Sequence, residues 1–256
     1  MDNSQVYEKF DWDSLTDSSL SGKISRIFET IPGDVNEILD VGCGNGVITN
    51  ALGDKYNVTG VDRSTAALKS VKTKKVQASA DNIPLDDNSF DMVFSSELLE
   101  HLDDQTLDKT VSELCRISKK YIFITVPNAE NPDKLSIKCP NCKYIYNRPN
   151  HLRSFNSGSL INLFADFELV TSFTYGRKVR YYNNSLLRLK RAISPADSWI
   201  PYFWIDKNSR STICPSCEHE FENEYRFCIR ATGVDTLNAI ISPKKPYWLF
   251  ALMRKK

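Results

Sequence analysis

The sequence has no run of 18 apolar residues, and 33 basic residues nearly balance 32 acidic ones, for a net charge of +1. The lack of a long apolar run argues against a membrane-spanning helix. The near balance of charges means that the protein has no strong positive field to attract nucleic acid, which is therefore not an expected partner. The N-terminal stretch MDNSQVYEKFDWD lacks the basic start and apolar core of a secretory signal. A cytoplasmic location is the default expectation.

The overall composition is typical of a globular protein. Of the 256 residues, 41% are hydrophobic and 25% are charged, which are ordinary values for a soluble domain. This length permits one large α/β domain, or one such domain with an insertion.

One stretch, EILDVGCGNG at residues 37–46, organises the chain. A short apolar run predicts a buried strand, with Asp40 near its end. Three glycines follow, Gly42, Gly44 and Gly46, and residues 47–55 have the pattern of a helix. Glycines let a backbone approach a ligand closely, because no Cβ intervenes. The N–H groups at a helix start favour an anionic group. The stretch therefore predicts a site for a small polar ligand.

This G-x-G-x-G spacing, with an acid two residues ahead, resembles motif I of the class I S-adenosylmethionine-dependent methyltransferases, and in particular their methyltransferase-11 type. It differs from the G-x-G-x-x-G fingerprint of dinucleotide-binding proteins, so an NAD-linked oxidoreductase is disfavoured. The resemblance implies an α/β fold, a doubly wound, mostly parallel, seven-stranded Rossmann-like sheet, and S-adenosyl-L-methionine as cofactor. It covers about residues 20–175 and the last strand.

The second predicted strand, residues 56–62, ends in Asp62. An acid at this place in a doubly wound sheet can accept both ribose hydroxyls. Asp62 thus resembles the ribose-binding acid of the family, with Arg63 beside it. The alternative is an Asp that caps a helix predicted over residues 64–75.

The adenine site departs from the family pattern. A third strand is predicted over residues 76–79, followed by SADNIPLDDNSFDMV. In this alignment the family's adenine-binding Asp falls on Ser79, and Asp81 is the substitute candidate. The full set of candidate cofactor residues is Asp40, Gly42, Cys43, Gly44, Gly46, Asp62, Arg63, Ser79, Ala80, Asp81 and Ser96.

Two histidines are candidate general bases, since a neutral imidazole accepts a proton near pH 7. His101 lies in SELLEHL, residues 96–102, after a fourth strand predicted at 90–95. His151 lies in NRPNHLRSF, which resembles an H-x-R-x-F segment of the family. The alternative in both cases is a packed or capping histidine without a catalytic role.

The remaining pattern continues the alternation of strand and helix. A helix is predicted at 107–117, a fifth strand at 121–126, a helix at 157–164, a sixth strand at 168–175 and an antiparallel seventh at 247–254. Residues 1–175 plus 245–256 form the predicted cofactor-binding domain, and 176–244 an insertion. Residues 1–20 carry Tyr7, Phe10 and Trp12 and form either a lid or a loose arm.

Four of the seven cysteines occur as two C-P-x-C pairs, Cys139/Cys142 and Cys214/Cys217. Two such pairs can complete a tetrahedral zinc site, and in a reducing compartment metal is favoured over disulfides. A structural Zn²⁺ joining the insertion to residues 139–142 is therefore predicted. A redox pair and unligated thiols are the alternatives. Zinc knuckles often carry glycine after the second cysteine, where this chain has Lys143 and Glu218.

The insertion combines positive charge with flat rings. Residues 177–191 contain six cations and no acid, namely Arg177, Lys178, Arg180, Arg188, Lys190 and Arg191. Flat apolar surface is added by Tyr181, Tyr182, Trp199, Tyr202, Phe203 and Trp204. Such a set suits an anionic acceptor with a ring, such as a phosphosugar or lipid-linked glycan. It also suits an anionic membrane surface. The plain alternative is a solvated helix face with a small core.

The expected function is therefore methylation of a small-molecule or glycan-type acceptor, on oxygen or nitrogen. One alternative is a methyltransferase for RNA or protein that uses the zinc module as a reader. Another is a non-catalytic, cofactor-binding interaction protein.

Overall fold

The computed structural model describes residue 8, residue 12 and residues 17–201, 204–205 and 210–256. The chain forms two compact units. The first, the sheet unit, contains the described residues up to Asn128 together with Phe155–Arg177 and Pro246–Lys256. The second, the hairpin unit, contains Ala129–Ser154 and Lys178–Lys245.

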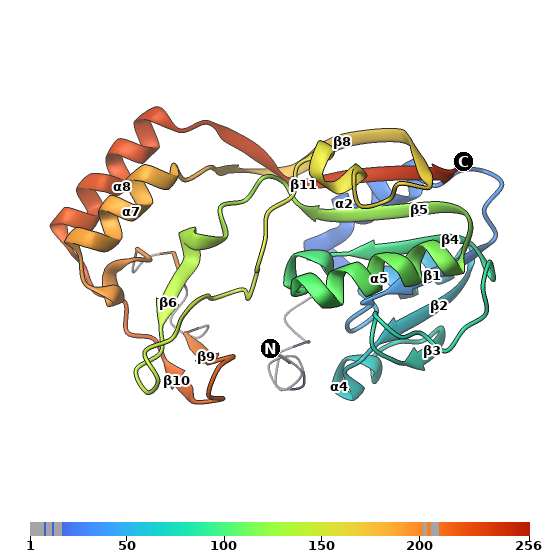
Figure 1. Ribbon diagram of the computed structural model, residues 1–256, viewed down its shortest axis with the longest axis horizontal. Coiled ribbons are helices and arrows are strands. Elements are labelled where there is room, and N and C mark those ends of the chain that lie inside the picture. Colours follow the sequence, from blue (N-terminus) through green and yellow to red (C-terminus); the bar gives the residue numbers. More distant parts are fainter. Residues whose placement is uncertain (1–7, 9–11, 13–16, 202–203, 206–209) are drawn as a thin grey trace. The chain divides into compact units, whose positions relative to one another are not determined.

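A seven-stranded sheet forms the sheet unit, in the order β3-β2-β1-β4-β5-β11-β8 (Figure 1). Its strands are β1 (Glu37–Val41), β2 (Asn57–Asp62), β3 (Lys74–Gln77), β4 (Phe90–Ser96), β5 (Ser118–Pro127), β8 (Phe167–Arg180) and β11 (Lys244–Lys255). The pairs among β1 to β5 are parallel, and β11 runs antiparallel to β5. The predicted mostly parallel sheet with a reversed last strand is confirmed.

The helices of this unit are α2 (Asp17–Thr30), α3 (Val47–Gly53), α4 (Thr65–Leu68), α5 (Asp104–Ile117) and α6 (Ser157–Ile161), with a 3₁₀ turn η2 at Leu99–His101. In α5 the predicted apolar stripe is buried, including Leu107 and Leu114. Its first turn is capped by Asp103, whose carboxylate accepts from the Thr106 N–H at 3.0 Å. Figure 1 shows α5 lying along the sheet.

The helix predicted over residues 64–75 is wrong in length, because α4 ends at Leu68. Beyond it, Val71 is buried beside Gly46, and the chain turns into β3 at Lys74 instead of Val76. The third strand was predicted two residues late, because its first two residues, Lys74 and Lys75, are exposed cations without an apolar pattern. Lysines are typical of edge strands, where they discourage pairing with other chains.

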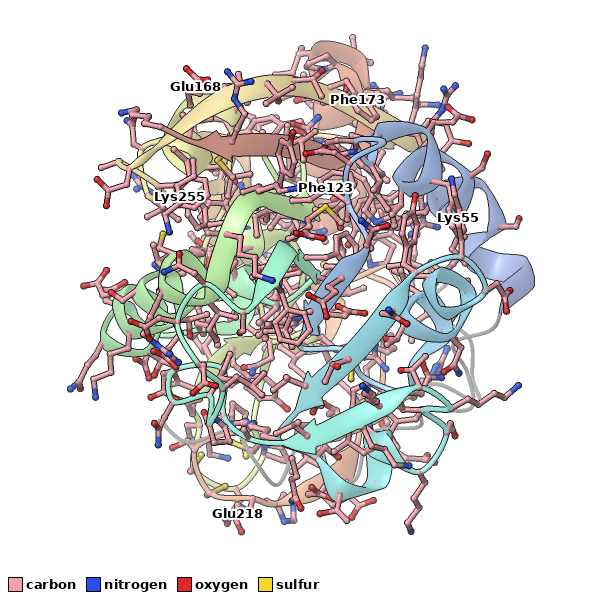
Figure 2. The ribbon with its side chains drawn as sticks, turned by 90° about the vertical axis from the view of Figure 1, so that its right-hand side faces the viewer. Lys55, Phe123, Glu168, Phe173, Glu218 and Lys255 are labelled. Carbon is pink, nitrogen blue, oxygen red and sulfur yellow. The ribbon has the colours of Figure 1, made fainter. Side chains whose placement is uncertain are left out.

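Aromatic rings fill the layer between the sheet and α2. The Phe123 ring of β5 lies 6.2 Å from that of Phe250 in β11, and Phe173 of β8 stacks on Phe250 at 4.9 Å. Figure 2 shows Phe123 inside the unit, with Lys55 and Glu168 at its periphery. These ring contacts hold β5, β11 and β8 together. Because protein interiors are packed as densely as organic crystals, the three strands have little freedom to shift against one another.

The hairpin unit holds two short hairpins and two helices. The hairpins pair β6 (Ser136–Lys138) with β7 (Ile145–Asn147) and β9 (Ser211–Ile213) with β10 (Glu220–Glu222). The helices are α7 (Asn184–Ile193) and α8 (Ile229–Ile241), and two 3₁₀ turns lie at η3 (Pro132–Leu135) and η4 (Ala196–Ser198). The α7 and α8 helices are joined through the buried Lys190, whose Nζ lies 2.7 Å from Asp235 Oδ1.

Within the described part of the chain, no helix is both long and apolar enough to cross a membrane.

Candidate functional site

The glycine turn, residues 42–46, lies between β1 and α3, where parallel strands present their carboxyl ends. All three glycines have positive φ: 76° at Gly42, 53° at Gly44 and 77° at Gly46. A Cβ on Gly46 would come within 2.8 Å of the Val71 side chain, and one on Gly42 within 3.0 Å of Leu98. Both conformation and space therefore require glycine, which leaves a bare backbone cradle for a ligand.

The carboxylate of Asp62 closes the turn. Its Oδ2 accepts from the Gly44 N–H at 2.9 Å, and its Oδ1 accepts from the Ser64 N–H at 2.8 Å. Burial raises the pKa of Asp62, while these two hydrogen bonds act in the opposite direction. A helix-capping role was the alternative for Asp62. The cap of α4 is instead Ser64, whose Oγ accepts from the Ala67 N–H at 3.1 Å.

Trp12 covers the same turn. Its ring lies 2.7 Å from the position of a Cβ on Gly44, and its carbonyl oxygen accepts from Asn45 Nδ2 at 2.6 Å. The other two aromatic residues of the predicted lid, Tyr7 and Phe10, lie outside the described residues.

Asp40 is buried beneath the turn, with only 2% of its surface exposed. Its Oδ2 accepts from the Thr49 hydroxyl at 2.7 Å. Burial raises the pKa of Asp40 to about 7, against the effect of the Thr49 hydrogen bond. Cys43 also has a pKa raised by burial, so its thiol stays protonated and it serves the turn as a small packed residue.

The raised pKa of Asp40 predicts a specific pH dependence of stability. The folded state retains this proton between about pH 4 and 7, where the unfolded state has lost it, so stability falls as pH rises through that range. Between about pH 5 and 7.5 the wild type is expected to lose about 2 kcal/mol relative to Asp40→Asn. Urea unfolding at both pH values measures the difference. Asp54→Asn, an exposed carboxylate at the end of α3, is the control. Parallel pH profiles for wild type and Asp40→Asn would contradict the prediction.

The adenine candidates follow β3 at the same edge of the sheet. Ser79 donates its hydroxyl hydrogen to the Asp81 carboxylate, so the two predicted residues form one acidic group with Ala80 between them. Arg63, next to Asp62, lowers the pKa of that acid through its charge, but less than the backbone hydrogen bonds do.

Ser96 ends β4 and belongs to a polar cluster that contains a buried lysine. The Lys23 ammonium, 1% exposed, donates to Ser96 Oγ at 2.9 Å and to Glu97 Oε1 at 3.1 Å. Glu97 has φ of +55°, a strained conformation that clusters at functional sites. Glu97 lies in the SELLEHL segment at residues 96–102, whereas Lys23 was not predicted from the sequence. The only sequence signal of Lys23 is a cation within an otherwise amphipathic helix, which is typical of solvated faces.

The two candidate bases lie in different units. His101 ends η2 in the sheet unit, with Nε2 4.0 Å from Glu100 Oε1. His151 lies in the hairpin unit, 7% exposed, and its Nδ1 is hydrogen-bonded to Glu130 Oε2. A carboxylate on Nδ1 favours the tautomer with its lone pair on Nε2. Glu130 was also missed, because it is far from His151 in sequence.

All four cysteines of the C-P-x-C pairs meet in the hairpin unit, with their sulfur atoms within 4.8 Å of one another. Cys139 Sγ lies 3.7 Å from Cys217 Sγ, and Cys142 Sγ lies 3.6 Å from Cys214 Sγ. Zinc binds thiolates at about 2.3 Å, which gives a tetrahedron with edges of about 3.8 Å. This cysteine cluster could therefore hold one zinc ion.

Both knuckles have the same backbone geometry. Lys143 and Glu218 have φ of 64° and 56°, the left-handed conformation that glycine often supplies at this place. Their N–H groups donate to the Cys139 and Cys214 carbonyls at 3.1 and 2.9 Å. The backbone of each turn therefore has the expected left-handed conformation, although Lys143 and Glu218 stand where glycine is common.

A basic cavity of about 490 Å³ lies in the hairpin unit, and Tyr181, Arg188, Arg191 and Lys245 are among the residues that line it. Other members of the predicted cationic and aromatic set have structural roles. Arg180 donates to the Ser242 carbonyl at 2.6 Å, and Lys190 and Tyr182 both bond Asp235. The Trp199 ring is covered by Arg191 at 5.4 Å. Tyr202 and Phe203 lie outside the described residues.

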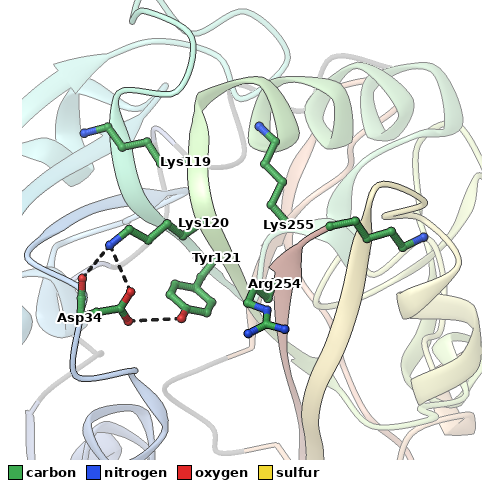
Figure 3. Close-up of a pocket in the computed structure, with 7 residues that line it drawn as sticks. Asp34, Lys119, Lys120, Tyr121, Arg254 and Lys255 are labelled. Carbon is green, nitrogen blue, oxygen red and sulfur yellow. Dashed lines mark hydrogen bonds and ion pairs between the residues drawn. The ribbon is translucent and has the colours of Figure 1, made fainter.

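A smaller cavity of about 320 Å³ lies in the sheet unit at the start of β5 and the end of β11. Figure 3 shows Lys120 and Tyr121 directed at Asp34, at 3.1 and 3.2 Å. Arg254 pairs with Glu168. The amino ends of parallel strands are opposite to the ligand-binding edge, so we assign this charged cluster to the structure of the sheet and not to the cofactor site.

Comparison with known proteins agrees with this geometry. Residues 39–123 match a family model described as a methyltransferase domain. An uncharacterized protein of Methanocaldococcus jannaschii is 32% identical over 122 residues, 46% of this chain and 52% of that protein. A ubiquinone biosynthesis O-methyltransferase of Paracidovorax citrulli is 34% identical over 79 residues, 26% of this chain and 33% of that enzyme. The chain thus spans about half of the first relative and a third of the second.

A solved SAM-dependent methyltransferase from Archaeoglobus fulgidus has the same fold, with a TM-score of 0.58 and 18% identity over 94% of this chain and 95% of that one. The sheet order and the glycine turn define a Rossmann-like methyltransferase domain. Residues 39–123 thus match a methyltransferase domain, and the fold that contains them is that of a SAM-dependent methyltransferase.

Proposed function

We propose that the protein transfers a methyl group from S-adenosylmethionine to a small-molecule or glycan-type acceptor. The observation that carries this proposal is the bare glycine turn with the Asp62 carboxylate bound to its Gly44 N–H. When bound, S-adenosylmethionine supplies an electrophilic methyl group on its sulfonium. The similarity of residues in this chain to a ubiquinone biosynthesis O-methyltransferase of Paracidovorax citrulli supports a small acceptor and methylation of oxygen.

The residues of the site position the cofactor, since methyl transfer depends chiefly on an aligned approach. We assign the backbone of residues 42–46 to its amino-acid end, with Asp40 toward the ammonium. We assign Asp62 to the ribose hydroxyls and the Ser79–Asp81 pair to the adenine amino group. Ser96 and its bound Lys23 border the same edge of the sheet, at the end of β4.

His151 is the base that we favour, because Glu130 holds its ring. Replacing His151 with alanine is expected to lower kcat about a hundredfold if the acceptor is a hydroxyl or a protonated amine. Glu130→Gln keeps the side-chain volume but not the charge, and a smaller loss is expected. Steady-state kinetics with labelled S-adenosylmethionine measures both.

His101→Ala is the matched comparison for that experiment, because His101 is the other candidate base and its Nε2 lies 4.0 Å from Glu100 Oε1. If kcat falls in His101→Ala but not in His151→Ala, His101 and not His151 is the base. Wild-type turnover in both variants would show that the reaction needs neither histidine.

We also propose that the cysteine cluster binds one structural Zn²⁺. Four sulfur ligands leave no open position for substrate, so the metal would join the two hairpins and take no part in catalysis. The distances between sulfur atoms and the repeated knuckle geometry support this assignment.

Native mass spectrometry followed by an acceptor screen tests the proposed function. A mass gain of one S-adenosylmethionine, and release of S-adenosylhomocysteine with phenols or glycans, would support it. Turnover with RNA or protein alone would favour the alternative in which the zinc module is a reader. Binding without turnover of any acceptor class would favour a non-catalytic interaction protein.

A further inference from the structure

The basic cavity of the hairpin unit contains charge that the protein itself does not neutralise. Among the residues that the structure describes, neither Arg188 nor Lys245 forms an ion pair. The acids of the cavity are already engaged, since Asp133 pairs with Arg191 at 3.3 Å and Glu130 bonds His151. The five charged side chains that line the cavity sum to +1, and the two that form no ion pair among the described residues, Arg188 and Lys245, are both positive.

Arg191 is fixed in place at the cavity wall. Its Nη2 donates to the Asp133 carbonyl at 2.9 Å and to Ser136 Oγ, and its guanidinium stacks on Trp199. Its buried Nε has no hydrogen-bond partner in the described part of the chain, and an unmade bond to a buried donor is costly.

We propose that this cavity binds a phosphate group attached to a ring. A phosphate monoester carries a charge of about −1.5 to −2 near pH 7, which matches the two unpaired cations better than a single carboxylate does. Tyr181, over whose ring Lys245 lies at 5.7 Å, offers a flat surface for a sugar. A cavity of about 490 Å³ has the size of a typical small-ligand site.

That this phosphate belongs to the methyl acceptor rests on the proposed function, whereas the affinity of the cavity for phosphate does not. Titration calorimetry with inorganic phosphate and then glucose 6-phosphate tests the site. Arg188→Gln and Lys245→Gln are each expected to weaken binding about tenfold. Lys178→Gln, which removes an exposed cation outside the cavity, is the matched control and should leave binding unchanged.

Two further titrations separate the outcomes. Binding of S-adenosylmethionine is measured in the same samples, so a chain that binds phosphate but not the cofactor refutes the proposed function alone. Absence of phosphate binding, or equal loss in Lys178→Gln, overturns the cavity assignment. Vesicles of phosphatidylcholine with phosphatidic acid form the last arm: binding lost in Arg188→Gln indicates a lipid headgroup, whereas binding of glucose 6-phosphate alone indicates a free sugar phosphate.

The exposed face of α8 carries a second, independent inference. Its large aliphatic residues point outward, with exposed fractions of 76% for Ile229, 46% for Leu237, 76% for Ile240 and 56% for Ile241. Asn238, by contrast, is buried and accepts from the Asn183 N–H. Helix α8 lies beside α7 in Figure 1. The side of α8 that carries these four aliphatic residues is exposed and does not pack against the core.

We infer that this face docks on an anionic lipid surface. From residue 227 to 245 the exposed charges are Arg230, Lys244 and Lys245, all positive, while the one acid, Asp235, is bound by Lys190 and Tyr182. Arg230 belongs to the first turn of α8 and Lys244 and Lys245 to the start of β11, so the charges near the exposed aliphatic residues are positive at both ends of the helix. Basic residues near an anionic bilayer are attracted to its surface.

Cosedimentation with vesicles of phosphatidylcholine, with and without phosphatidylglycerol, tests this surface. Ile229→Gln together with Ile240→Gln should reduce binding to anionic vesicles at least tenfold, and added salt should weaken wild-type binding. Leu169→Gln, an exposed aliphatic residue of β8, is the matched control. Failure of the wild type to bind anionic vesicles overturns the inference, as does a dimer in sedimentation velocity that the double variant abolishes.

Discussion

Asp62→Ala is expected to weaken binding of S-adenosylmethionine at least a hundredfold. The carboxylate would accept from two ribose hydroxyls, and hydrogen bonds to a charged group are worth about 1.5 to 3 kcal/mol each. It also holds the Gly44 N–H at 2.9 Å, so its removal loosens the turn that receives the cofactor. Titration calorimetry on the purified chain measures the loss.

Two further variants keep that result interpretable. Asp62→Asn retains one acceptor oxygen without the charge, and an intermediate affinity is expected. Asp54→Ala removes an exposed carboxylate at the end of α3 and should bind like the wild type. A folded Asp62→Ala chain with wild-type affinity would remove Asp62 from the cofactor site.

Removal of zinc from the cysteine cluster is expected to have the largest effect on stability. Apparent binding free energies of structural zinc sites are about 10 to 16 kcal/mol near neutral pH. Besides the cysteines, the two short hairpins share a small apolar cluster that includes Ile137, Tyr146 and Phe221. In the double variant Cys139→Ser, Cys214→Ser, the mass of the native protein should no longer include one zinc ion. The backbone amides of β6, β7, β9 and β10 should lose their protection from hydrogen exchange. The strands of the sheet unit should keep their protection, because none of the four cysteines belongs to that unit.

Cys228→Ser is the control within the same unit, since Cys228 lies outside the cluster. It should retain the metal. A wild-type chain that carries no zinc, with a mass two hydrogens lower for each bonded pair, would instead support the redox alternative. In the structure the sulfur atoms are 3.6 and 3.7 Å apart within the closest pairs, well beyond the length of a disulfide bond.

Local sequence was a good guide wherever one strand or turn dictates its own geometry. The G-x-G-x-G turn requires positive φ and close approach, and both appear at Gly42 and Gly46. The same holds for α5, whose apolar period matches its buried face. Prediction was wrong about the bounds of β3 and α4. Two exposed lysines begin β3, so the strand starts two residues before its apolar pattern, and the helix ends early where Val71 packs against the glycine turn.

Pairs that are distant in sequence were invisible until the chain folded. Nothing near His151 marks Glu130 as its partner, and Lys23 has no local feature that identifies its bonds to Ser96 and Glu97. Equally, the cationic residues of the insertion look alike in sequence. Folding buries Lys190 against Asp235, whereas Arg188 lines a cavity and forms no ion pair with any residue that the structure describes.

The sequence by itself determined the class of sheet, the glycine turn and the pairing of four cysteines into two C-P-x-C motifs. Backbone sterics and ligand chemistry depend on neighbouring residues and on their spacing along the chain, and both can be read from the sequence. Tertiary structure alone decided which cations remain unpaired, which acid holds His151, and which face of α8 is exposed. Those properties depend on burial and on contacts between remote segments, and burial is a property of the packed chain and not of any one residue.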